Sequence, residues 1–178
     1  MHQLAPLDTA KPKPELYADL CEQLQKLLGN ESDLIANCAN TVALLFHHLP
    51  GVSWAGFYLT EDEELVLGPF QGKPACSRIE IGKGVCGTAF ERQETVIVED
   101  VNEFGGHIVC DPASASEIVV PLVNWGNVIG VLDLDSESKA RFDEDDREGL
   151  EMIVSVLLGS LESDDLPDLS EENAAIEE

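Results

Sequence analysis

The chain has 178 residues, of which 44% are hydrophobic, so it can bury one domain-sized core. Its formal net charge is -25, from 35 acidic and 10 basic residues, which argues against binding to nucleic acid or to an anionic membrane surface. No apolar run reaches the roughly 18 residues that a membrane-spanning helix needs. The first residues lack the basic and apolar regions of a signal peptide, so we expect a cytoplasmic protein.

One folded domain with a tail at each end is expected. Residues 1–14 contain three prolines and predict an irregular arm, whereas residues 15–162 carry helix and strand patterns. Residues 163–178 are rich in acidic side chains and contain no lysine or arginine. This composition is typical of a solvated, partly disordered tail.

Two helices are predicted at the start of the domain. Residues 15–28 place leucines at helical spacing and are followed by Gly29, a residue that commonly ends helices. Residues 33–49 form a second, broadly apolar helical pattern that stops before Pro50, and Ser32 is expected to cap it. The width of its apolar side indicates that this second helix is largely buried.

The middle of the chain changes to strand patterns, and a last helix follows them. We expect strands over residues 52–60, 64–72, 77–82 and 95–100, and two more in the hairpin 117–136. A short helix is expected over residues 83–93 and the last one over 142–162, capped by Asp143. Because hairpins and loops join most strands, the fold class is α+β, with a central, mainly antiparallel sheet of about six strands and helices on its faces.

Five cysteines are present, and an odd number in a cytosolic chain does not indicate a structural disulfide framework. Cys21 and Cys38 lie in helical patterns and are interpreted as small core residues. Cys76, Cys86 and Cys110 lie in turn-rich segments, where a thiol stays reachable. These three could still be apolar fillers, so their role depends on the residues around them.

A structural zinc site is not expected from the cysteine spacing. Zinc sites usually contain close pairs such as C-x-x-C, whereas Cys76, Cys86 and Cys110 are 10 and 24 residues apart. His107 and Cys110 form an H-x-x-C pair, but no second pair matches it. We therefore predict no metal site.

Thiol chemistry is the main alternative to a filler role. Cys86 lies just inside a predicted helix, where free amide groups and the helix dipole would favour its thiolate. Cys110 lies in a long loop between two strands, beside Asp111, which would raise the pKa of the thiol if the two were close. No residue that would activate Cys110 is visible in the sequence.

Three carboxylates are expected to meet at one mouth of the sheet. Asp133 and Asp135 are two residues apart and share a face of the second hairpin strand, and Glu117 begins the first strand. Pairing about the turn Trp125-Gly126-Asn127 brings these strand ends together. Such a cluster suits an ammonium group, and mutual repulsion would make one carboxyl a proton donor. The alternative is a set of exposed strand-end charges.

Five segments resemble GAF-domain free methionine-(R)-sulfoxide reductases, namely "SWAGFYL", "GPFQGKPAC", "IEIGKGVCGTAF", "HIVCDPASASEIVVPL" and "GVLDLDS". The resemblance runs from about residue 16 to about residue 161. It implies a GAF fold, usually in a homodimer, and the reduction of free L-methionine (R)-S-oxide to L-methionine. It implies neither a metal nor an organic cofactor, because a dithiol carries the two electrons.

The resemblance also implies roles for the three turn-region cysteines. The catalytic thiol of the family falls on Cys110, which would attack the sulfoxide sulfur and become a sulfenic acid. Cys76 is the expected resolving thiol, and Cys86 is the alternative. Thioredoxin would then reduce the disulfide.

The substrate contacts implied by the resemblance fall on the carboxylates and on two aromatic residues. Glu117, Asp133 and Asp135 would hold the ammonium group and help to protonate the sulfoxide oxygen. Trp54 and Tyr58 would pack against the methyl group and set the stereochemistry. Backbone amides that could meet the substrate carboxylate lie near three residues, Ile108, Val109 and Ser116.

Two other functions are weighed against the reductase. A GAF sensor module could bind a cyclic nucleotide or another small ligand, although the acidic residues would repel a phosphate. A redox-sensing interaction protein could use the same thiols without turnover. Stereospecific reduction of the free sulfoxide distinguishes the enzyme from both.

Overall fold

The computed structural model describes residues 6–106, 108 and 110–161. Its helices are α1 (Lys13–Leu28), α2 (Leu34–His48), α3 (Gly84–Arg92) and α4 (Glu144–Leu158). Its strands are β1 (Trp54–Glu61), β2 (Glu64–Gln71), β3 (Arg78–Glu80), β4 (Val96–Val98), β5 (Ser116–Asn124) and β6 (Asn127–Ser136). Residues 1–5 of the expected arm and the acidic tail 163–178 lie outside the described residues. None of the described helices is long and apolar enough to cross a membrane.

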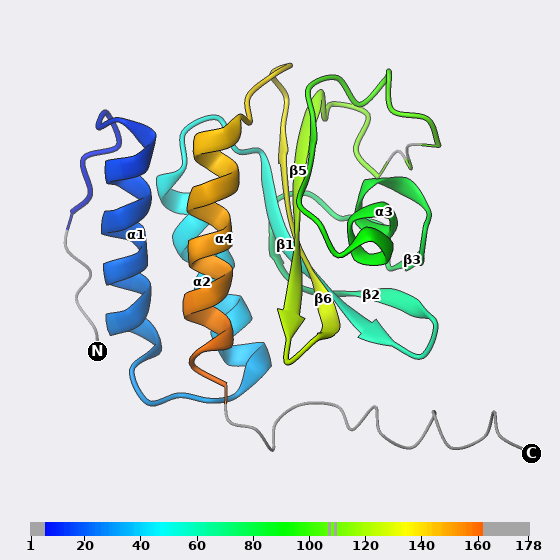
Figure 1. The fold of residues 1–178 in the computed structure, drawn as a ribbon. Coiled ribbons are helices and arrows are strands. Elements are labelled where there is room, and N and C mark those ends of the chain that lie inside the picture. The colour runs from blue at the N-terminus through cyan, green and yellow to red at the C-terminus, as the bar shows by residue number, and fades with distance from the viewer. Residues whose placement is uncertain (1–5, 107, 109, 162–178) are drawn as a thin grey trace, which may run out of the picture.

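The six strands form one sheet in the order β3-β2-β1-β6-β5-β4, and every neighbouring pair is antiparallel. Figure 1 shows α1, α2 and α4 on one side of the sheet, with α1 outermost, and α3 on the other side. Helices therefore cover both faces. The predicted α+β class, with six antiparallel strands and a short helix before β4, is confirmed.

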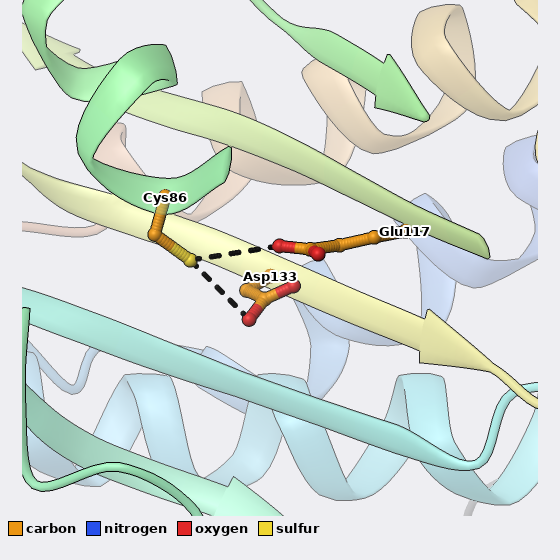
Figure 2. A group of neighbouring side chains, drawn as sticks. All are labelled: Cys86, Glu117 and Asp133. Carbon is orange, nitrogen blue, oxygen red and sulfur yellow. Dashed lines mark hydrogen bonds between the residues drawn. The ribbon is translucent and has the colours of Figure 1, made fainter. Parts of the chain in front are cut away.

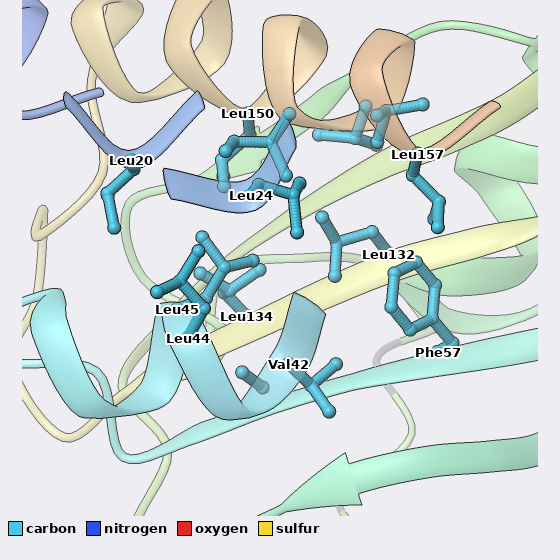
Figure 3. Close-up of a cluster of buried hydrophobic side chains, with 14 of the residues drawn as sticks. Leu20, Leu24, Val42, Leu44, Leu45, Phe57, Leu132, Leu134, Leu150 and Leu157 are labelled. Atoms are coloured by element: carbon cyan, nitrogen blue, oxygen red, sulfur yellow. The ribbon is translucent and has the colours of Figure 1, made fainter. Parts of the chain in front are cut away.

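Side chains alternate along the central strands and separate two apolar clusters, one on each face of the sheet. Phe57 of β1 and Leu132 of β6 pack toward α1, α2 and α4 (Figure 3). Trp54 and Tyr58 of β1 belong to the cluster on the opposite face, together with apolar residues of α3. Asp133 follows Leu132 directly, so it lies on the α3 face.

All four helix starts differ from the sequence prediction by one or two residues, and the first two show why. Helix α1 begins at Lys13, inside the expected arm, because Pro14 occupies its first turn, where a missing amide hydrogen costs no helical hydrogen bond. Helix α2 is capped by Asp33 and not by Ser32. The Asp33 carboxylate accepts a 2.7 Å hydrogen bond from a first-turn amide, so the stronger of two adjacent capping residues is used.

The β5–β6 hairpin turns on two residues, Trp125 and Gly126, rather than on the three predicted. Both have positive φ, 50° and 87°, as the favoured two-residue hairpin turn requires. Asn127 already belongs to β6 and pairs with Asn124. A register shift of one residue between Leu122 and Val123 follows the turn, and it places Glu117 opposite Asp135 instead of Leu134.

A Gly149→Ala substitution in α4 is expected to destabilise the protein by about 1–3 kcal/mol. A Cβ atom there would lie 2.1 Å from Cγ of Tyr17, a fully buried ring on α1. This overlap outweighs the gain of about 1 kcal/mol in helix propensity. Urea denaturation measures the change. The control is Gly105→Ala, where nothing lies within 4 Å, and equal stability of both variants would contradict the prediction.

Candidate active site

A pocket lies on the α3 face of the sheet, between β1, β5, β6, α3 and two loops. Seven of the eight residues predicted for the site line it: Trp54, Tyr58, Cys86, Cys110, Glu117, Asp133 and Asp135. The eighth, Cys76, lies beside it and is bonded to Cys110. The wall is completed by Ile108 and Asp111, both named in the sequence analysis, and by residues that it did not name: Pro74, Ala75, Ile79, Gly84, Val85 and Ser114.

The loops that carry Cys76 and Cys110 are joined covalently and electrostatically. A disulfide connects the two cysteines, whose Cα atoms are 5.4 Å apart. Lys73, three residues before Cys76, pairs with Asp111 at 2.9 Å. A hydrogen bond from a backbone amide lowers the pKa of Asp111, and the ion pair with Lys73 lowers it further. Its negative charge is therefore balanced by Lys73. Cys76 and Cys110 are the pair that the resemblance implies, and Cys86 remains a free thiol.

The three carboxylates meet because of the hairpin register. Glu117 of β5 lies opposite Asp135 of β6, and Asp133 lies one pair further along the same face. Glu117 and Asp133 are buried, whereas Asp135 is partly exposed at the mouth. The alternative of exposed strand-end charges therefore fails for the two inner residues.

Helix α3 places the Cys86 thiol directly over these carboxylates. Its Sγ atom lies 3.4 Å from Oδ2 of Asp133 and 3.9 Å from Oε1 of Glu117 (Figure 2). Among the described residues, Oδ1 of Asp133 has no hydrogen-bond partner although it is buried. A buried carboxylate oxygen without a partner indicates that the pocket is suited to a ligand that carries a donor or a positive charge.

Burial and mutual repulsion determine the acid–base behaviour of the cluster. Burial raises the pKa of Glu117 well above the usual carboxyl range, and the charge of Asp135 raises it further. The pKa of Asp133 is raised in the same way, first by burial and then by Asp135 and Glu117. A carboxyl group in this environment keeps its proton to a higher pH than an ordinary carboxyl and can donate it.

The expectation that the start of α3 favours a thiolate at Cys86 is wrong. Burial raises the pKa of this thiol well above its ordinary value, and the charges of Asp133 and Glu117 raise it further. A helix dipole contributes only about 0.3–1 kcal/mol near the helix terminus, which is too little to offset complete burial beside two carboxylates. Cys86 is therefore a protonated thiol near neutral pH.

An Asp133→Asn substitution is expected to stabilise the protein, and more so at higher pH. The folded-state pKa of Asp133 is raised, so the folded state binds more protons than the unfolded chain between the ordinary carboxyl range and the raised value. Stability is therefore lost as pH rises through this window, and asparagine removes the loss. Urea denaturation at about pH 5 and about pH 8 measures the change. Exposed Glu63→Gln is the control, and a pH-independent gain in Asp133→Asn would contradict the account.

Trp54 and Tyr58, which form an aromatic wall of the pocket, are hydrogen-bonded to the loop that carries Cys76. The Trp54 and Tyr58 rings are stacked with centroids 6.0 Å apart. The Trp54 indole N–H donates to the backbone carbonyl of Lys73, and the Tyr58 hydroxyl donates to that of Cys76, each at 3.0 Å. The wall and the Cys76 loop therefore form one connected unit.

The remaining cysteines and suggested backbone groups have simpler environments. Cys38 is fully buried in the helix-side core, where burial raises its pKa to about 12, and Cys21 packs at the edge of that core. Both are small core residues, as predicted. Ser116 does not line the pocket, and its hydroxyl donates to the carbonyl of Ser138. His107 and Val109 lie outside the described residues.

The fold and the pocket match a known class of domain. Residues 33–159 match the family model of the GAF domain. The structure of free methionine-R-sulfoxide reductase from Neisseria meningitidis in complex with its substrate aligns with a TM-score of 0.84 and 44% sequence identity. This alignment covers 89% of the present chain and 95% of the Neisseria chain. The chain is a GAF-domain protein.

Sequence relatives narrow this class. The free methionine-R-sulfoxide reductase of Escherichia coli is 53% identical over 145 residues, which cover 82% of this chain and 88% of the relative. The free methionine-R-sulfoxide reductase of Saccharomyces cerevisiae is 42% identical over 153 residues, covering 82% of this chain and 85% of the relative. The chain belongs to the GAF-domain family of free methionine-(R)-sulfoxide reductases.

Proposed function

We propose that the protein reduces free L-methionine (R)-S-oxide to L-methionine by thiol chemistry. The observation that carries this proposal is the Cys76–Cys110 disulfide beside a pocket whose floor is a buried carboxylate cluster. A dithiol supplies two electrons, and the carboxylates supply a site for an ammonium group. Family membership supports the same activity.

The reaction begins with Cys110, which lines the pocket. Its thiolate attacks the substrate sulfur, the sulfoxide oxygen takes a proton, the substrate S–O bond breaks, and the resulting hydroxyl group is bonded to Sγ of Cys110 as methionine leaves. A buried carboxyl group whose pKa is raised, Glu117 or Asp133, is the proton donor in this step. The product on the protein is a Cys110 sulfenic acid.

Cys76 then completes the oxidation. Its thiol attacks the sulfenic sulfur of Cys110, water leaves and the disulfide forms. Cys86 is buried among carboxylates, so Cys76 is favoured as the resolving thiol. Both disulfide cysteines are partly exposed, so a thioredoxin dithiol can reach the bond and reduce it by exchange.

Recognition of a free amino acid follows from the charges of the pocket. Glu117, Asp133 and Asp135 accept the substrate ammonium, which a methionine residue inside a protein chain lacks. Trp54 and Tyr58 pack against the methyl group and select the R configuration. Within this proposal the protein is a cytoplasmic homodimer that uses no metal or organic cofactor and binds neither nucleic acid nor membranes.

The activity is tested with thioredoxin, thioredoxin reductase and NADPH. Free methionine (R)-sulfoxide is expected to drive NADPH oxidation, whereas the free S isomer and a peptide-bound R-sulfoxide give only background rates. Binding of a small ligand without R-specific NADPH oxidation would favour the GAF sensor instead. Oxidation of the thiols by peroxide alone, without turnover of any sulfoxide, would favour the redox sensor.

A Tyr58→Phe substitution is expected to slow the resolving step by about 2- to 10-fold while methionine release stays near its normal rate. Phenylalanine keeps the aromatic wall but removes the hydrogen bond to the carbonyl of Cys76. Rapid quenching after one substrate equivalent separates the two steps, because free methionine and remaining thiols are counted in the same samples. Equal slowing of both steps would mean that the hydroxyl does not act through Cys76.

A further inference from the structure

One thiol and two carboxylates meet in the pocket, and the proposed reductase mechanism gives the thiol, Cys86, no step of its own. The Sγ atom of Cys86 and one carboxylate oxygen from each of Glu117 and Asp133 all lie within 4.8 Å of one another. Each residue comes from a different element, α3, β5 or β6, and all three are buried. Figure 2 shows both carboxylates directed toward the sulfur.

The spacing matches the coordination geometry of a small divalent cation. With Zn–S near 2.3 Å and Zn–O near 2.1 Å, tetrahedral angles place sulfur and oxygen ligands roughly 3.6 Å apart. The sulfur-to-oxygen distances here are 3.4 Å to Asp133 and 3.9 Å to Glu117. They bracket the expected separation, so a cation can sit between the three atoms with small side-chain movements.

Two further features point to a cationic ligand. Asp133 is only 5% exposed, and its Oδ1 atom has no hydrogen-bond partner among the described residues. No lysine or arginine is among the described residues that line the pocket. Lys73, which pairs with the pocket residue Asp111, is also paired with Glu137.

We propose that Cys86, Glu117 and Asp133 form a binding site for a thiophilic divalent cation such as Zn²⁺. Binding transfers the thiol proton of Cys86 to solvent and forms a sulfur–metal bond, with no oxidation or reduction. Three protein ligands leave a fourth position for water, as in open zinc sites. The ion occupies the carboxylates that the substrate ammonium needs, so it inhibits the enzyme; this consequence rests on the proposed function, whereas binding does not.

The Cys86 thiol distinguishes a metal-binding site from a cluster of acidic residues that attracts any cation. An ammonium group contacts the carboxylates and gains little from a thiol, whereas Zn²⁺ and Cd²⁺ bind thiolates strongly. The Cys76–Cys110 disulfide consumes the other two pocket thiols. In the oxidised protein, metal–thiolate bonding in this pocket therefore requires Cys86.

The test titrates the oxidised full-length protein with Cd²⁺ and records the ultraviolet thiolate-to-metal charge-transfer band. One saturable Cd²⁺ equivalent is expected, which Zn²⁺ displaces. The Cys86→Ser variant should lose the band, while Cys21→Ser, which alters a thiol on the opposite side of the sheet, should keep it. A band that persists in Cys86→Ser, or no band in the unaltered protein, would overturn the proposal.

A second variant keeps the Cys86 thiol, so it tests the site even if Cys86→Ser does not fold. Glu117→Gln should weaken Cd²⁺ binding by about 10- to 100-fold, because it removes one charged ligand. Unchanged affinity would mean that the carboxylates do not coordinate the ion.

With the reductase assay, Zn²⁺ should raise the apparent KM for the free sulfoxide and leave kcat unchanged. A chain that binds Cd²⁺ but reduces no sulfoxide would refute the proposed function alone.

Discussion

The Cys110→Ser variant is expected to lose more than about 10³-fold of the turnover of free methionine (R)-sulfoxide. A serine hydroxyl stays protonated near neutral pH and cannot accept the sulfoxide oxygen as a thiolate does when it becomes a sulfenic acid. Cys110 lines the pocket and is bonded to Cys76, so it is the thiol that is both placed to meet a ligand and able to form a disulfide. Thioredoxin-coupled NADPH oxidation measures the loss.

Companion variants separate the nucleophile from the resolving thiol. Cys76→Ser should still release one methionine per chain in a single turnover but should not cycle with thioredoxin, because no disulfide can form with Cys110. Cys21→Ser, which changes a thiol in the helix-side core, should cycle normally. Full turnover by Cys110→Ser would refute its assignment as the nucleophile while leaving the activity itself intact.

The Asp146→Ala variant is expected to lose about 3–5 kcal/mol of stability. Asp146 is completely buried at the start of α4, where it accepts hydrogen bonds from the Tyr17 hydroxyl at 2.9 Å and from Arg141 at 3.1 Å. Lys13 of α1 also pairs with it, and it accepts a bond from the backbone amide of Asp143 in a capping box. Its removal leaves two cations and a hydroxyl without their shared acceptor.

A neighbouring acidic residue provides the matched control for this variant. Asp145 lies in the same first turn of α4 but is exposed, so Asp145→Ala should change stability by no more than about 1 kcal/mol. Chemical denaturation of both variants and the unaltered protein gives the comparison. Similar losses in the two variants would show that negative charge in the first turn of the helix, and not the buried ion pairs, accounts for the effect.

The hairpin is the part of the site that the sequence predicts best. The expected three-residue turn pairs Glu117 with Asp135, and the structure reaches the same pairing through a two-residue turn followed by a register shift of one residue between Leu122 and Val123. Strict alternation then places Asp133 on the same face. The central strands and the last helix follow from equally local signals, namely periodicity and the Asp143 cap.

Contacts between distant segments are the part that local patterns do not predict. The position of Cys86 at a helix start suggested a thiolate, but packing of α3 on the sheet buries it against Asp133 and reverses that expectation. The spacing of the cysteines likewise gave no signal of the cluster of Cys86, Glu117 and Asp133, because its members come from three separate elements. The Lys73–Asp111 pair spans 38 residues, and no local pattern in the sequence indicated it.

A single-turnover experiment tests the thiol mechanism most directly. Fully reduced protein, without thioredoxin, is mixed with one equivalent of free methionine (R)-sulfoxide or its S isomer, and free methionine and disulfide-linked peptides are quantified. We predict one methionine per chain from the R isomer, none from the S isomer, and a new disulfide between Cys76 and Cys110. Failure to release methionine from the R isomer, or release without oxidation of Cys110, would contradict the mechanism.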